Sequence, residues 1–186
     1  GAYIDTQRSI PDRIAAVIWV PGEEPTYVVC NLEEIQARAE TWIKDIRVYF
    51  EFETSPVDVI VEVLRERGLA GRRVGLEFNH LTLEYYRQLN VAFDARYFPA
   101  DTALARARTV KTAEAIAILR EAAQLTEQSI WDALLAARPG MTEAEINVKQ
   151  QSALLSRGVP EVAFNVLAAG KNTCLTHAIP GLYKIQ

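Results

Sequence analysis

The sequence has few of the residues that build disulfide frameworks and metal centres. Its 186 residues include only two cysteines and two histidines. Cys30 and Cys174 lie far apart, form no Cys-x-x-Cys pair and have apolar neighbours. We therefore expect reduced, buried thiols. A disulfide between them is the alternative.

Long runs of basic or apolar residues are also missing. The net charge is −4 and no Lys/Arg run is longer than Arg72-Arg73, so nothing indicates a nucleic-acid partner. The longest apolar runs, such as residues 14–20, are far shorter than the roughly 20 residues that cross a bilayer. The N-terminus lacks a charged region followed by an apolar stretch, which argues against a signal peptide. The expected location is the cytoplasm, with no membrane partner.

Several familiar catalytic motifs are absent. The chain contains no G-x-S-x-G, G-x-x-x-x-G-K-[ST], H-E-x-x-H or G-x-G-x-x-G sequence. The acidic residues near the expected helices mostly lie opposite apolar stripes, which is typical of a solvated helix face.

The first half of the chain alternates between strand and helix patterns. Strands are expected at residues 13–20, 25–31, 46–52 and 72–78, and helices at 32–42, 56–64 and 81–89. Asn31 is placed to cap the first helix, with Leu32, Ile35 and Ala39 on one face. Pro56 at a first helical position and Gly68 beyond the end mark the second helix. This alternation predicts a small α/β domain.

The second half begins after a short charged link at residues 101–111, which we interpret as a hinge between packed domains. Apolar residues then recur at helical spacing from residue 112 to about 138: Ile116, Leu119, Ala123, Ile130 and Leu134. Thr142 and Glu145 form a capping box that starts a second helix, ending near Ser156. Residues 162–170 and 173–179 are expected to form two short strands joined by a tight turn.

The two histidines are expected to have different roles. His80 lies at a strand-to-helix junction with no second ligand type nearby, so we expect a turn or capping residue. His177 lacks neighbours suited to metal binding. It is either a structural residue at a strand end or a hydrogen-bond donor or proton shuttle in a site assembled from elsewhere.

Three segments carry a resemblance to a known family. They are RARTVKTAEAIAILREAAQLT (106–126), RPGMTEAEI (138–146) and FNVLAAGKNTCLTHAIP (164–180). In this order they resemble the creatinase and Xaa-Pro aminopeptidase/prolidase family, the "pita-bread" metallopeptidases. The resemblance is strong from Thr109 onward and looser over the first hundred residues.

The resemblance implies a fold and a domain division. Residues 1–105 would form a creatinase-like N-terminal α/β domain. From Gly1-Ala2-Tyr3 we expect its first strand-helix unit to be lacking. Residues 106–186 would form the first part of an incomplete α+β pita-bread catalytic domain.

The resemblance also implies a site. His177 matches the family histidine that lines the substrate cleft and hydrogen-bonds the substrate or the tetrahedral intermediate. It is therefore the catalytic and substrate-binding candidate. The family's metallopeptidases bind two divalent ions (Mn, Co or Zn) through carboxylates and a histidine. After His177 this chain has no Asp, Glu or His, so no metal ligand is expected within it.

The implied activity is metal-dependent hydrolysis of peptide bonds that precede proline, by a cytoplasmic, homodimeric aminopeptidase or dipeptidase. We expect that activity in an intact parent chain, and expect these residues alone to be inactive. The alternatives are a metal-free, creatinase-type amidinohydrolase and a non-catalytic fragment or oligomerisation module.

Overall fold

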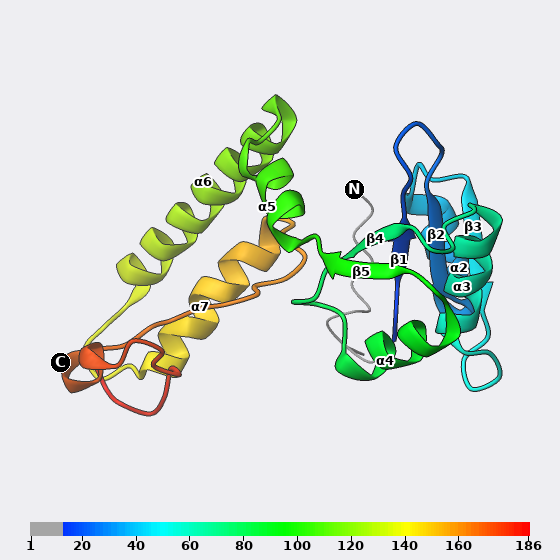
Figure 1. The fold of residues 1–186 in the computed structure, drawn as a ribbon. Coiled ribbons are helices and arrows are strands. Elements are labelled where there is room, and N and C mark those ends of the chain that lie inside the picture. Colours follow the sequence, from blue (N-terminus) through cyan, green and yellow to red (C-terminus); the bar gives the residue numbers. More distant parts are fainter. Residues whose placement is uncertain (1–12) are drawn as a thin grey trace. The chain divides into compact units, whose positions relative to one another are not determined.

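The computed structural model describes residues 13–186, so the expectation about Gly1-Ala2-Tyr3 lies outside the described residues. The chain divides between Thr109 and Val110 into two units. Figure 1 shows strands gathered in the first unit and long helices in the second. Among the described residues, no helix is long and apolar enough to cross a bilayer.

The described part of the first unit contains two small sheets. Strands β1 (Ala16–Ile18), β2 (Thr26–Cys30) and β3 (Asp45–Tyr49) form one sheet in that order, with β1 antiparallel and β3 parallel to β2. Strands β4 (Arg73–Leu76) and β5 (Arg96–Pro99) form a parallel pair. The helices of this unit are η1 (Asn31–Glu33), α2 (Glu34–Glu40), α3 (Pro56–Glu66), α4 (Leu83–Ala92) and α5 (Asp101–Thr109).

The core is built on both faces of β2, whose five residues are all buried. Successive side chains of a strand point to opposite faces. Val28 and Cys30 accordingly lie in one apolar cluster, with α3 and α4, while Tyr27 and Val29 lie in a second. A strand that is covered on both faces has a nearly continuous apolar sequence, as residues 26–30 (TYVVC) do.

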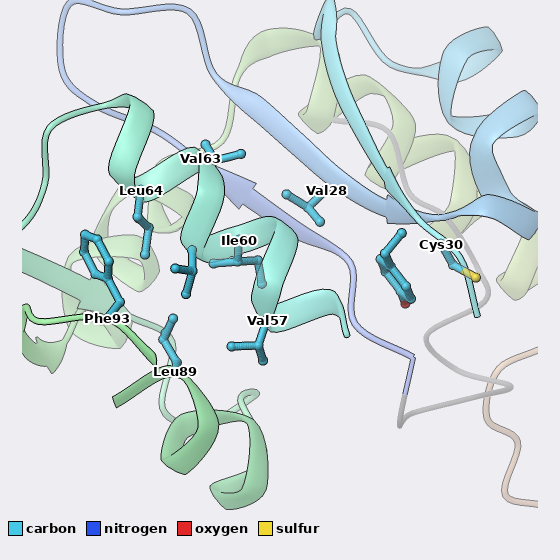
Figure 2. Close-up of a cluster of buried hydrophobic side chains, with 10 residues drawn as sticks. Val28, Cys30, Val57, Ile60, Val63, Leu64, Leu89 and Phe93 are labelled. Atoms are coloured by element: carbon cyan, nitrogen blue, oxygen red, sulfur yellow. The ribbon is translucent and has the colours of Figure 1, made fainter. Parts of the chain in front are cut away.

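Helix α3 supplies half of the buried residues of the first cluster. Its buried residues follow helical spacing: Val57, Ile60, Val61, Val63 and Leu64. Figure 2 shows Ile60 between the strand that carries Val28 and the segment that carries Leu89 and Phe93. Each such side chain contributes about 1.5–3 kcal/mol when fully buried. Ser55 caps the helix by accepting a hydrogen bond from the Val57 amide (3.2 Å).

The prediction for the segment after β2 is wrong in its details. Leu32 and Ile35 are 62% and 86% exposed, and Ala37 is the buried apolar residue of α2. Asn31 does not cap a helix, because its side-chain oxygen accepts a hydrogen bond from the Glu51 amide (3.0 Å). The inward face carries Glu33, whose carboxylate accepts a hydrogen bond from Arg13. The spacing of residues in this segment does not reveal that partner.

The link expected at residues 101–111 contains helix α5, which the sequence analysis did not predict. Asp101 in its first turn accepts hydrogen bonds from the amides of Phe78 (3.1 Å) and Asn79 (3.0 Å). These bonds fix the turn that carries His80, whose amide donates to the Glu77 carbonyl (3.1 Å). His80 is thus a turn residue, as predicted.

The second unit consists of α6 (Ala113–Ala136), α7 (Glu143–Ser156) and the short η2 (Gly170–Cys174), with irregular backbone between and after them. Both long helices end close to where the sequence predicts. The apolar face expected on α6 is largely exposed among the described residues. Ile116, Leu119 and Leu134 are exposed, whereas Ser129 and Ala133 are buried.

The two strands expected at residues 162–170 and 173–179 do not form. A strand persists only where its N–H and C=O groups pair with a neighbour. Within the described residues, the segment has no such neighbour and Gly170–Cys174 coils into a 3-10 helix instead. The cysteine prediction is half right: both thiols are free, Cys30 is buried and Cys174 is exposed.

Candidate functional site

The first turn of α7 is held by its own capping box, as predicted. The Thr142 hydroxyl accepts from the Glu145 amide (3.2 Å), and the Glu145 carboxylate accepts from the Thr142 amide (2.7 Å). The Glu145 carboxylate also accepts from the Thr142 hydroxyl (2.9 Å), and the hydrogen bonds from the Thr142 amide and hydroxyl hold the pKa of Glu145 below its ordinary value. The pair satisfies two of the amides that a helix start leaves without a partner.

The remaining amides of this turn are satisfied by a segment far along the chain. The amide of Glu143 donates to the Tyr183 carbonyl (3.0 Å), and that of Ala144 donates to the Gly181 carbonyl (3.0 Å). Thr142 also forms an isolated antiparallel bridge with Lys184. Residues 181–185 therefore lie along the start of α7.

The side chain of Glu143 is the most buried charged group of the unit, at 1% exposure. Its Oε1 accepts from the Ala169 amide (2.7 Å) and from the Asn172 side-chain nitrogen (3.1 Å). Its Oε2 accepts from the Gly181 amide (3.2 Å) and lies 3.3 Å from the same Asn172 nitrogen. The Ala169 hydrogen bond, with those of Asn172 and Gly181, holds the pKa of this carboxyl below its ordinary value.

Residues 164–181 form the segment that we call the His177 loop. Its beginning is tied to the middle of α7. The Asn165 side-chain nitrogen donates to the side-chain oxygens of Gln150 (3.0 Å) and Asn147. Gln150 is buried, so this contact lies under the loop rather than on the surface.

His177 lies in an exposed turn of this loop, next to the buried Ala178. Its ring meets that of Phe164 edge-on, with centroids 6.0 Å apart and planes at 65°. The loop thus brings His177 beside a residue 13 positions earlier and leaves the imidazole open to solvent. This arrangement permits the ring to donate a hydrogen bond to a molecule bound from outside, or to carry a proton.

The sequence analysis proposed His177 through its family resemblance and did not single out Glu143. A glutamate in the first turn of a capped helix is ordinary, and its loop partners lie 26 to 38 residues away. Nothing in the local pattern distinguishes it from a solvated acid.

A metal site does not emerge from these residues. Within residues 13–186, no group of three or more His, Cys, Asp or Glu side chains lies together in a way that could hold an ion. The described residues therefore do not fit the divalent ions that the resemblance implies, and no chemical step is assigned to such ions here.

Comparisons with known proteins match both units. Residues 11–110 match the model of the Creatinase/Prolidase N-terminal domain, and residues 117–186 match that of Metallopeptidase family M24. A Bacillus subtilis protein named "Putative dipeptidase YkvY" is 26% identical over 172 residues, which are 91% of this chain and 47% of that protein. The chain spans about half the length of the curated relatives that it matches.

Solved structures share the fold. An Xaa-Pro dipeptidase from Bacillus anthracis superimposes with a TM-score of 0.81 at 22% identity, over 97% of this chain and 50% of that one. An X-Pro aminopeptidase from Thermotoga maritima gives a TM-score of 0.78 at 21% identity, over 93% and 48%. The predicted fold class is confirmed: a creatinase-type N-terminal α/β domain followed by the start of a pita-bread domain. The chain belongs to the creatinase and prolidase family of metallopeptidases.

Proposed function

We propose that the intact parent chain hydrolyses peptide bonds that precede proline, as an aminopeptidase P or a prolidase, using two divalent metal ions that residues 13–186 do not hold by themselves. The observation that carries the proposal is the match of residues 117–186, the unit that holds His177, to Metallopeptidase family M24. The names of the Bacillus anthracis and Thermotoga maritima neighbours, both Xaa-Pro peptidases, support this substrate class. We also propose a cytoplasmic homodimer, with a domain boundary between residues 105 and 106, four residues before the division between the two units.

The role of His177 in this proposal is to donate a hydrogen bond to the substrate carbonyl as it becomes an oxyanion. Such a donor acts where charge develops, so its effect falls on the transition state more than on the bound substrate. Two features support the role: the ring is exposed, and the loop on both sides of it is fixed to α7.

The test is an assay of the protein as its gene encodes it, purified and supplied with manganese or cobalt. We expect hydrolysis of an Xaa-Pro dipeptide or of an Xaa-Pro-Xaa tripeptide, and none of the matched peptides with alanine in place of proline. The preferred peptide length separates dipeptidase from aminopeptidase. Release of urea from creatine without metal would instead identify an amidinohydrolase. No turnover of either substrate would contradict the proposal and favour a non-catalytic role.

The histidine variants test the assigned role. We expect His177→Ala to lower kcat by roughly 10²-fold or more, the scale of losing a transition-state donor, with bound metal unchanged. His80→Ala is the matched control, because His80 is an exposed turn residue of the other unit. Equal loss in both variants, or loss of metal from His177→Ala, would overturn the role.

A further inference from the structure

The carboxylate of Glu143 connects the two arms of the His177 loop. Ala169 lies eight residues before His177, and Gly181 lies four residues after it. Both backbone amides donate to this one side chain, through different oxygens. The buried Glu143 carboxylate therefore fixes the distance between Ala169 and Gly181, the two residues that flank the His177 turn.

This connection needs a hydrogen-bond acceptor on both oxygens of the side chain. All three groups that face the carboxylate are N–H donors: the Ala169 amide, the Gly181 amide and the Asn172 side chain. A carboxylate offers acceptors on both oxygens, whereas a glutamine replaces one oxygen with a donor. In Glu143→Gln, an NH₂ group would therefore face an N–H, and one arm would lose its anchor.

Glu143 is itself held in place by the start of α7. Glu143 lies in the first turn of α7, where the capping box fixes the helix start. The Tyr183 carbonyl accepts a hydrogen bond from the Glu143 amide. The Asn165 contact ties the beginning of the loop to the same helix two turns later. Phe164, which packs against the His177 ring, is thus next to a second tethered residue.

We infer that Glu143 is a positioning residue, which holds the imidazole of His177 in the place where it meets the substrate. The inference rests on the proposed function of His177 and extends it. Glu143 does not touch the reacting atoms; it acts through the loop. A catalytic group displaced by about 1 Å can cost 10²-fold in rate, so the effect belongs in kcat.

The experiment compares Glu143→Gln with Glu145→Gln in the protein as its gene encodes it. Glu145 lies in the same helical turn, and a glutamine there preserves the capping box. Both variants remove one charge, so the comparison isolates the anchoring bonds. We expect Glu143→Gln to lower kcat on an Xaa-Pro peptide by roughly 10- to 100-fold with KM and bound metal nearly unchanged, and Glu145→Gln to change kcat less than twofold.

A double-mutant cycle distinguishes positioning from general destabilisation. If Glu143 acts through His177, Glu143→Gln has no further effect on kcat in the His177→Ala background. Losses that multiply in the double variant would overturn the inference while leaving the proposed function intact.

Hydrogen exchange supplies a readout that needs no activity. We expect peptides covering residues 166–182 to exchange at least tenfold faster in Glu143→Gln than in Glu145→Gln, because the Ala169 or Gly181 amide loses its acceptor. Equal exchange in the two variants would overturn the inference even if no peptide substrate were hydrolysed. A protein without peptidase activity would contradict the proposed function, and the exchange comparison would still decide whether Glu143 orders the loop.

Discussion

At the scale of single residues, backbone conformation at Gly170 determines how the His177 loop fits against the end of the described chain. Gly170 has φ of +51°, and an added Cβ would overlap the hydroxyl group and the ring of Tyr183. Gly158, just beyond α7, has φ of +83° and no described atom within 4 Å of such a Cβ. The two glycines share a left-handed conformation and differ in the space around them.

This difference predicts unequal effects of alanine. Left-handed backbone costs a residue with a Cβ roughly 1–2 kcal/mol, which both variants incur. Gly170→Ala must also displace Tyr183, and overpacking adds about 1–3 kcal/mol. We therefore expect Gly170→Ala to lower the free energy of unfolding by about 2–5 kcal/mol and Gly158→Ala by about 1–2 kcal/mol. Urea denaturation measures both, and equal losses would mean that Tyr183 moves aside without cost.

Residue roles were predictable from the sequence where the partners are local. Thr142 and Glu145 are three residues apart, and their capping box could be recognised from spacing alone. His177 was proposed from the resemblance of three segments to a known family, and its contact with Phe164 was not foreseen. Glu143 stayed hidden because its hydrogen-bond partners lie in a distant loop of irregular backbone.

At the scale of elements, α4 tests whether the apolar cluster around α3 holds a neighbouring helix in place. Leu89 is 5% exposed and packs with α3 and Phe93, whereas Leu83 on the same helix is 73% exposed. Truncating a buried leucine removes transfer energy and leaves a cavity, while an exposed one loses little.

We expect Leu89→Ala to destabilise the first unit by about 2–5 kcal/mol and Leu83→Ala by less than about 0.5 kcal/mol. Urea midpoints of the two variants, followed by circular dichroism, provide the comparison. A Leu89→Ala variant as stable as the parent would show that the cluster does not hold α4 in place.

Elements were predictable where their own sequence carries a complete pattern. The five buried residues of α3 repeat at helical spacing, and β2 is a continuous apolar strand, so both were foreseen. The inward face of α2 was not, because its buried residue, Ala37, packs with residues of other segments: Tyr27, Val29 and Ile43. The strands expected around His177 failed because strand formation depends on a neighbour, which the segment's own residues cannot specify.

At the scale of the whole molecule, buried apolar residues are unevenly divided between the units. Both apolar clusters of the described residues belong to the first unit. In the second unit the buried apolar residues are Ala133, Ile146, Leu154 and Ala178, while α6 exposes Ile118, Trp131 and Leu135. Helices without a substantial buried face gain little from tertiary packing.

This division predicts different behaviour of the two units when they are produced separately. A fragment of residues 1–110 should unfold in one cooperative urea transition, because it retains the clusters around β2 and α3. A fragment of residues 111–186 should show helical circular dichroism but a broad transition, and it should bind an apolar dye through the exposed side of α6. A sharp transition without dye binding in the second fragment would mean that α6 and α7 form a sufficient core by themselves. In that case the exposed apolar side chains of α6 would not be the reason for low stability of the second unit.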